Sequence, residues 1–203
     1  MSEDLGLFEA IYTLRAMRRL KPDPVPEEAL WKVLEAATRA PSGANVQPWN
    51  FVVIRDAATK AKIAEYYRDA WDNTYGRQRE AMLANPAQSR TYRSAEYLAH
   101  HLAEMPVLIL ICSRGPIGNG GSIFPAVQNL MLAARGLGLG TSLTSLHRLH
   151  EAEIKALLDI PAEVETAALI PLGYPRGKFG AGPRRPVEQV AYWDKWSATK
   201  ERP

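Results

Sequence analysis

Residues 40–49 read Ala40-Pro41-Ser42-Gly43-Ala44-Asn45-Val46-Gln47-Pro48-Trp49, and the apolar run Phe51-Val52-Val53-Ile54 follows them. The apolar run predicts a strand, because it is short and rich in β-branched and aromatic residues. The loop before it carries hydroxyl and amide side chains, which donate and accept hydrogen bonds, and Gly43 lets a ligand come close to the backbone. Taken alone, the loop also fits a capped turn that leads into the strand.

Two small clusters of arginines lie on either side of this loop. Arg15, Arg18 and Arg19 lie near the N-terminus, and Arg184 and Arg185 lie near the C-terminus. Arginine meets a phosphate group with a planar fork of donors, and a phosphomonoester carries roughly −1.5 to −2 charges. Two separate clusters favour a discrete anion over a long polyanion. The first cluster, taken alone, also fits a solvated helix end.

The rest of the chain alternates amphipathic segments with a few short apolar runs. Helical spacing of apolar residues predicts helices, and short continuous apolar runs predict buried strands. We expect helices over 7–19, 26–37, 59–71, 122–137 and 151–158, strands over 51–54, 107–112 and 165–172, and an extended segment over 141–146. Residues 77–101 are compatible with helix and break near Asn85-Pro86, and a lid is one alternative for their role. This pattern predicts an α+β or α/β sandwich with a central sheet covered by helices.

Length and composition predict a single globular domain over residues 1–203. Of the 203 residues, 46% are hydrophobic and 23% charged, which suits a domain with its own core. Residues 178–203 are rich in proline, arginine and tryptophan, and fit either packing on another subunit or a solvated tail. The net charge of +3 is too weak to indicate a nucleic-acid partner. With no apolar run near ~18 residues and no signal-peptide pattern, we expect a cytoplasmic protein without a membrane partner.

The chain offers no obvious catalytic set of its own. The single cysteine, Cys112, lies in an apolar run, which is typical of a core thiol. The four histidines lack the spacing of metal ligands. The run Gly136-Leu137-Gly138-Leu139-Gly140 follows a predicted helix rather than a strand, so it indicates helix termination and not a dinucleotide site. An enzyme with this sequence therefore needs a cofactor to carry its chemistry, and we expect no metal.

The order of these features resembles the nitroreductase family of flavoproteins. In that family an arginine cluster precedes a valine-proline pair and a loop of the form Ala-Pro-Ser-x-x-Asn-x-Gln-Pro-Trp, as residues 15–19, Val25-Pro26 and residues 40–49 do here. The loop is the specific signal. Supporting matches span nearly the whole chain, at Ala126–Ala134, Gly138–Gly140, Leu172–Pro175 and Arg184–Glu188.

The resemblance implies an α+β fold, a three-layer sandwich with a central mixed sheet flanked by helices. It implies an intertwined homodimer with one FMN in each of two interface clefts, and residues 178–203 packed on the partner subunit. The side chains that it places around FMN are Arg15, Ala16, Met17, Arg18, Arg19, Pro41, Ser42, Gly43, Asn45, Gln47, Thr144, Ser145, Leu146, His147, Arg184 and Arg185. Residues 41–45 come from the other subunit in this arrangement, with Gln47 close by.

Within this set the resemblance implies different roles. Arg15 and Arg185, with Arg184 beside it, bind the phosphate, whereas Arg18 or Arg19 lies near the phosphate or the pyrimidine edge of the ring. Residues 144–147 pass over one flavin face near N5. The sequence departs from the family at Ala16, where a serine is usual, at Leu20, where a phenylalanine is usual, and at Leu146-His147, where some members have Glu-Gly.

The implied activity is NAD(P)H oxidation with ping-pong transfer of hydride through flavin N5 to a small-molecule acceptor such as a nitroaromatic or a quinone. No catalytic side chain is needed, because the flavin carries the chemistry. Two alternatives stay open: other flavin chemistry on the same fold, such as dehalogenation, dehydrogenation or flavin breakdown, and a non-catalytic flavin-binding protein. The sequence does not choose between NADH and NADPH, and it does not identify the acceptor.

Overall fold

The helices begin at residues whose local chemistry favours a helix start. A computed structural model describes residues 5–118 and 121–201, so the loop expected over 114–121 falls partly outside the described residues. Helix α2 (Glu27–Thr38) follows Pro26 and carries two glutamates in its first turn, which suits the helix dipole. Helix α3 (Ala57–Asn73) is capped by Asp56, whose carboxylate accepts the backbone N–H of Thr59 at 2.7 Å.

The other helices and the strands follow the predicted order. The segment expected to be helical and broken near Asn85-Pro86 is α4 (Arg79–Ala84) and α5 (Pro86–His101), and the break is confirmed. The remaining elements are α1 (Leu7–Thr13), α6 (Ile123–Gly136), α7 (Glu151–Leu157), β1 (Trp49–Ile54), β2 (Val107–Arg114), β3 (Gly140–Thr141) and β4 (Val164–Gly173).

The sheet has the strand order β1-β2-β4-β3, and every pairing is antiparallel. The expectation of a mixed sheet is therefore wrong for the described part of this single chain, although the α+β class is confirmed. The connections explain the difference, because the chain leaves and re-enters the sheet at the same end. Ile54 at the end of β1 is the register partner of Leu108 near the start of β2, although α3, α4 and α5 lie between them in sequence.

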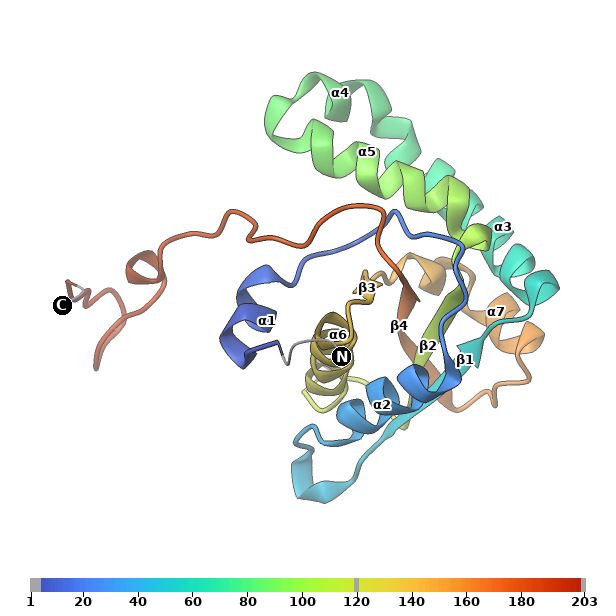
Figure 1. Cartoon of the computed structure of the whole chain (residues 1–203), viewed down its shortest axis with the longest axis horizontal. Helices are drawn as coiled ribbons and strands as arrows, with labels where there is room; N and C mark the ends of the chain where they lie inside the picture. The colour runs from blue at the N-terminus through green and yellow to red at the C-terminus, as the bar shows by residue number, and fades with distance from the viewer. Residues whose placement is uncertain (1–4, 119–120, 202–203) are drawn as a thin grey trace.

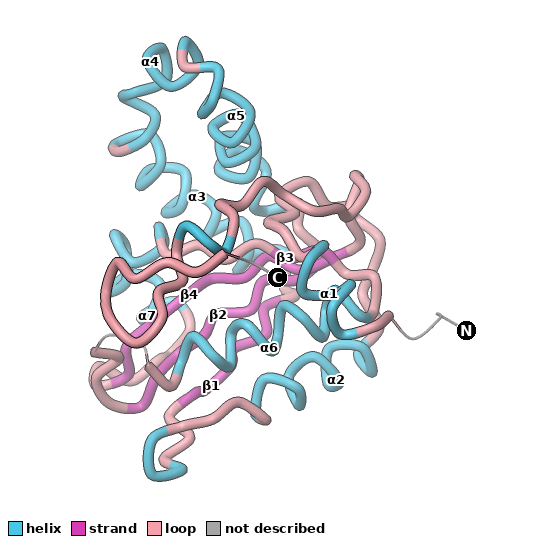
Figure 2. Tube along the Cα trace, turned by 90° about the vertical axis from the view of Figure 1, so that its left-hand side faces the viewer, coloured by secondary structure: helices cyan, strands magenta, loops and turns pink. Residues whose placement is uncertain are grey.

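Helices cover both faces of the sheet and make three layers (Figures 1 and 2). Successive residues of a strand point to opposite faces, and β2 supplies both hydrophobic cores. Ile109 and Ile111 pack with α2 and α6, whereas Leu108 and Leu110 pack with α3, α5 and α7. Cys112 lies in the second core with 2% of its surface exposed, as expected for a core thiol, and burial raises its pKa to about 11.

Helix α1 differs from the prediction in length and in burial. The helix expected over 7–19 ends at Thr13, because Leu14 is extended and the following segment pairs with the sheet. Its apolar residues Leu7 and Ile11 are 66% and 42% exposed, so they do not belong to the core of this chain. Helix α1 is held to the body by Arg135 of α6, whose Nε donates to the Thr13 hydroxyl at 3.0 Å.

Two parts of the chain project from the sandwich (Figure 1). Helices α4 and α5 form an arch that rises from the end of α3, and residues after about 178 run past α1 and away from the sheet. The helices in the described part of the chain are all too short or too polar to cross a membrane.

Candidate functional site

The arginine cluster lies on an extended segment, residues 15–20, that is fastened to the sheet by its backbone. Met17 N donates to Thr141 O at 2.8 Å, and Arg176 N donates to Arg19 O at 2.9 Å. The Arg15 guanidinium donates to Lys178 O at 2.6 Å. These bonds come from β3 and from the chain after β4, so two distant parts of the sequence fix the segment at one edge of the sheet.

The side chains of this segment divide between the core and the surface. Met17 and Leu20 are buried, whereas Arg18 is partly buried and Arg19 exposed. The close approach of the segment to β3 requires a residue without Cβ at Gly140, because a Cβ there would lie 2.8 Å from the Met17 Cβ. Packing of Met17 thereby directs Arg18 toward a cavity beside the sheet.

Arg18 shares this cavity with Tyr67 of α3 and Thr144. The hydroxyls of Tyr67 and Thr144 lie 2.9 Å apart in a hydrogen bond, and the backbone of Thr144 pairs with Leu169 of β4. Burial lowers the pKa of Arg18, which remains a cation at neutral pH. Burial also raises the pKa of Tyr67, so its phenol stays neutral. The site therefore presents one permanent positive charge beside neutral hydroxyl groups.

The cavity has a volume of about 450 Å³ and an aromatic wall under the arch of α4 and α5. The Trp71 ring lies 5.4 Å from the rings of both Tyr75 and Tyr92, centre to centre, and the Tyr92 hydroxyl donates to Tyr75 O at 3.2 Å. Such a hollow suits a flat aromatic ligand. The whole lining is Arg18, Tyr67, Trp71, Tyr75, Met82, Ala87, Gln88, Thr91, Tyr92, Ala95, Leu143, Thr144 and Leu146.

The aromatic wall is the part of the site that sequence reasoning missed. A helix was expected over 59–71, and residues 77–101 were interpreted only as compatible with helix, with a lid as one alternative for their role. A signal was present, because Tyr67, Trp71 and Tyr75 recur every four residues and so lie along one side of α3 and its extension. The arch of α4 and α5 covers this side.

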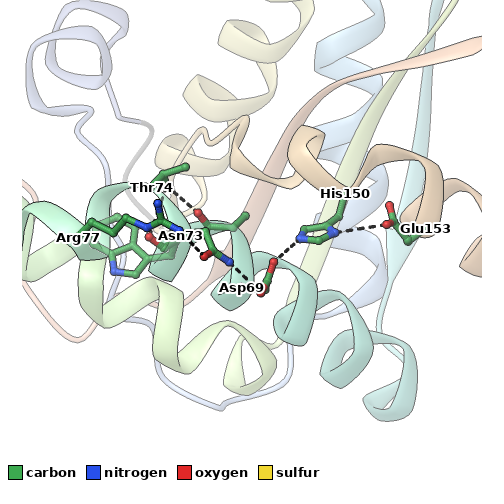
Figure 3. Close-up of polar contacts among 8 residues, drawn as sticks. Asp69, Asn73, Thr74, Arg77, His150 and Glu153 are labelled. Carbon is green, nitrogen blue, oxygen red and sulfur yellow. Dashed lines mark hydrogen bonds and ion pairs between the residues drawn. The ribbon is translucent and has the colours of Figure 1, made fainter.

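A network of polar contacts holds α3, the helix that carries Tyr67 and Trp71, in place (Figure 3). His150 Nε2 lies 2.7 Å from an Asp69 carboxylate oxygen, and His150 Nδ1 lies 3.5 Å from Glu153 of α7. Asn73 donates to Asp69 at 3.0 Å, and Arg77 donates to Asn73 at 3.0 Å. This network ties α3 to α7 and continues into the start of the arch.

Of the predicted site residues, the cavity brings together Arg18, Thr144 and Leu146. Arg19 lines a neighbouring cleft, and Ala16 and Ser145 are exposed nearby in sequence. Met17 is buried and serves as packing. The site assignment of these residues to FMN stays a prediction.

His147 points away from the cavity. Its side chain is fully buried, and Nε2 lies 3.1 Å from the hydroxyl of Thr166, which itself donates to Glu151 at 2.7 Å. The Thr166 proton is committed to Glu151, so His147 Nε2 must carry the proton of the neutral ring. Burial lowers the pKa of His147 to about 4. The His147 side chain therefore belongs to the core, and only its backbone lies beside the predicted flavin face.

The remaining predicted residues lie elsewhere in the single chain. Residues 41–47 form a loop around the short 3-10 turn η1 (Gly43–Asn45), far from residues 15–20 in both views (Figures 1 and 2). Three residues of this loop, Ala44, Asn45 and Gln47, have positive φ, and Gln47 N donates to the Ser42 hydroxyl at 3.1 Å. Arg184 and Arg185 lie in the projecting tail. One chain alone therefore does not assemble the predicted set.

Several buried polar atoms near residues 15–20 have no partner within the described chain. They are Arg15 Nε, Thr141 Oγ1 and Ser142 Oγ. Buried polar groups are almost always hydrogen-bonded, so unpartnered ones in a cluster indicate that a polar ligand completes them. A flavin mononucleotide offers such groups in its phosphate, ribityl chain and ring edge, and the residues present fit it. The residues that the structure describes contain no group of three or more potential metal ligands.

The sequence matches the nitroreductase family over residues 11–174. It is 29% identical over 198 residues to an NADH dehydrogenase of Thermus thermophilus, with 88% of this chain and 91% of the relative covered. It is 29% identical over 186 residues to an iodotyrosine deiodinase of Thermotoga neapolitana, with 89% and 95% covered. The fold is similar to a crystal structure of oxidized iodotyrosine deiodinase bound to FMN and 3-iodo-L-tyrosine, with a TM-score of 0.78, 25% identity, and 94% of this chain and 100% of that chain covered.

Proposed function

The chain belongs to the nitroreductase family, and on that premise we propose that it is an FMN-dependent NAD(P)H oxidoreductase that reduces nitroaromatic or quinone-like acceptors. Members of this family are flavin oxidoreductases, and a similar solved structure holds FMN. The observation that carries the proposal is that Arg18 lines the same aromatic cavity as the hydrogen-bonded side chains of Tyr67 and Thr144.

Bound FMN would supply the two-electron chemistry, accepting hydride from the reduced nicotinamide and delivering it to the acceptor. The chain contributes binding and electrostatics. Arg15 is the candidate partner of the phosphate, and Arg18 is the candidate partner of the pyrimidine edge, where a cation stabilises negative charge in a partly dry site. The Thr144 hydroxyl, which is hydrogen-bonded to Tyr67, is a candidate partner of a ring atom.

The aromatic wall is the candidate binding surface for the electron acceptor. Trp71, Tyr75 and Tyr92 offer ring faces and edges to a flat molecule, and the arch of α4 and α5 limits the water around it. Donor and acceptor would use the same cavity in turn, which predicts ping-pong kinetics.

We further propose that the working form is a homodimer. The loop at residues 41–47 and the tail arginines lie apart from residues 15–20 within one chain, and a second copy can supply what one copy lacks. Exposed apolar side chains on α1 and on the tail, such as Phe8 and Trp196, support such an interface.

Absorption spectroscopy tests the proposal directly. We expect the purified protein to be yellow and to lose its visible flavin absorbance when NADH or NADPH is added without oxygen. A nitroaromatic or quinone acceptor should then restore the absorbance. Flavin that keeps its absorbance with both nucleotides would contradict the proposed activity, and a protein that never binds FMN would contradict the site.

A second candidate is reductive removal of halogen from an aromatic ring. It is favoured by the similarity to two iodotyrosine deiodinases and by the aromatic lining of the cavity. Overall, the carbon–halogen bond breaks, two electrons from NAD(P)H and one proton make a carbon–hydrogen bond, and halide leaves. Halide release measured beside acceptor reduction, with the same enzyme sample, separates the two candidates.

A further inference from the structure

A second cleft lies on the other side of α5 from the aromatic cavity. Its volume is about 710 Å³. The elements around it are α4, α5 and the extended segment 15–20, which contributes Arg19. The lining residues are Arg19, Arg79, Leu83, Arg93, Glu96, Tyr97, His100 and His101.

Helix α5 separates the two hollows with opposite chemistries. Its residues Gln88, Tyr92 and Ala95, at helical spacing, face the aromatic cavity. The opposite face of the same helix carries Arg93, Tyr97 and His100, again at helical spacing, and lines the second cleft. The adjacent residues Arg18 and Arg19 divide in the same way, one into each hollow. The two sites are therefore about one helix diameter apart, roughly 10–12 Å.

The cleft has an excess of positive charge that the chain itself does not neutralise. Three arginines face one glutamate, which leaves two net positive charges with both histidines neutral. Glu96 is already paired with Arg79, at 2.8 Å. Arg19 and Arg93 form no ion pair with any carboxylate of residues 5–118 or 121–201. Unpaired arginines that share a cleft favour binding of an anion.

Stacking holds one of these arginines in a fixed orientation. The Arg19 guanidinium lies 4.4 Å from the centre of the Tyr97 ring, and the Tyr97 and His101 rings are stacked at 4.1 Å with 17° between their planes. A guanidinium bound by its face keeps the N–H donors of its edge free. His101 is also held, with Nδ1 2.7 Å from Glu104. The side chains of Arg19, Arg93 and His100 therefore offer hydrogen-bond donors in a cleft that also contains the stacked rings of Tyr97 and His101.

We propose that this cleft binds the 2′-phosphate of NADPH and makes the enzyme prefer NADPH to NADH. The inference rests on the proposed function, since it names the electron donor. A phosphomonoester carries roughly −1.5 to −2 charges and three strong acceptors, which matches several arginine and histidine donors better than an uncharged ribose does. A nicotinamide in the aromatic cavity and its adenosine phosphate in the second cleft place one dinucleotide across α5.

Steady-state kinetics with one variant and one matched control test the proposal. Replacing Arg93 by glutamine should lower kcat/KM for NADPH about tenfold or more, the usual effect of removing one charged hydrogen bond, and should change kcat/KM for NADH less than about twofold. Arg90→Gln changes the same charge on the same helix, but Arg90 lines neither hollow, so both values should stay within about twofold. Equal losses with both donors, or equal losses in both variants, would overturn the proposal.

A binding measurement separates this proposal from the proposed function. Titration calorimetry of the flavin-loaded protein should detect 2′,5′-ADP binding that is at least about tenfold tighter than 5′-AMP binding and is weakened by Arg93→Gln. If inorganic phosphate binds as tightly as 2′,5′-ADP, the cleft is a free-phosphate site and the proposal fails. If the protein binds 2′,5′-ADP tightly but oxidises neither NADH nor NADPH, the cleft does bind the phosphate, and the proposed oxidoreductase activity is wrong.

Discussion

Arg18 is the residue on which the proposed cofactor site depends most. Its guanidinium is partly buried beside the Tyr67 phenol, and no carboxylate of the described chain forms an ion pair with it. A partly buried cation without a paired anion destabilises the fold, and a bound ligand that carries negative charge removes this cost. We therefore propose Arg18, rather than the exposed Arg19, as the arginine at the flavin ring.

Replacing both Arg18 and Arg185 by alanine should give colourless protein. Each charged hydrogen bond contributes about 1.5–3 kcal/mol, so losing two weakens FMN binding roughly 10²- to 10⁴-fold. The flavin-to-protein ratio after gel filtration measures the effect. The control replaces Arg68 and Arg90, which are exposed helix residues outside both hollows, and should stay yellow. Full colour in the double variant of Arg18 and Arg185 would show that the assignment is wrong.

His147 makes stability depend on pH. Its folded pKa of about 4 lies below the ordinary 6.5, so unfolding takes up a proton between these pH values. The contribution of the neutral ring is complete above pH 6.5 and is lost as the pH falls toward 4. At pH 5 the loss is roughly 2 kcal/mol, from 1.36 kcal/mol for each pKa unit.

Urea unfolding at pH 7 and pH 5 tests this dependence. The difference in the free energy of unfolding between the wild type and His147→Gln should shrink by about 2 kcal/mol from pH 7 to pH 5, because glutamine does not titrate. A difference that stays constant for His147→Gln would mean that burial does not lower the pKa of His147.

Among the elements, the extended segment 15–20 shows how packing positions a functional group. Met17 and Leu20 are buried, and Arg18 and Arg19 line the two hollows, while the backbone of the segment is hydrogen-bonded to β3. Gly140→Ala would place a Cβ 2.8 Å from the Met17 Cβ, and overpacking of this kind typically costs about 1–3 kcal/mol. We expect lower stability and loss of bound flavin, because Arg15 and Arg18 shift with the segment.

The control for this change is Gly136→Ala at the end of α6, where a Cβ would meet nothing within 4 Å. Alanine there should be neutral or stabilise the helix by roughly 0.5–1 kcal/mol. Urea unfolding and the flavin-to-protein ratio should separate the two variants. If Gly140→Ala keeps both its stability and its flavin, the close approach does not position the arginines.

The sequence predicted the long helices well and the extended segment at residues 15–20 poorly. The period of apolar residues located α2 and α6 to within a residue or two, because local spacing determines those helices. It extended α1 through Arg19, since the partners that straighten residues 15–20 are Thr141 and Arg176, which lie far away in sequence. The aromatic wall was missed for the same reason, because its rings meet only when α5 folds back on α3.

For the whole molecule, the exposed apolar surface is the feature that one chain leaves unexplained. Phe8 and Tyr12 of α1 are each 66% exposed, and Trp193 and Trp196 of the tail are 56% and 85% exposed. The resemblance predicted a tail that packs on a partner; Phe179 at its start packs on the second core and on Arg135, whereas Trp193 and Trp196 stay largely exposed in the described chain. The loop at 41–47, which carried the family resemblance, likewise lies far from the predicted FMN residues 15–19 of its own chain.

Deleting residues 187–203 should weaken or abolish the proposed dimer while leaving Arg184 and Arg185 in place. The deleted segment holds Trp193 and Trp196, whose burial in an interface would be lost. Gel filtration at micromolar concentration should show a later elution, and a circular dichroism spectrum of the same sample should show that the helices remain. The full-length variant with both tryptophans changed to serine should move in the same direction. An unchanged elution volume in both would argue against a tail at the interface.

The buried thiol on β2 gives the protein an internal reporter of unfolding. Thiol reagents are attacked by the thiolate and hardly by the neutral thiol, and Cys112 combines 2% exposure with a pKa of about 11, so the folded chain should react very slowly. Because no other cysteine competes, each modified molecule records one opening of the central sheet. The modification rate thus measures opening of the core independently of flavin colour, and comparing it with and without FMN gives the share of stability that the cofactor contributes.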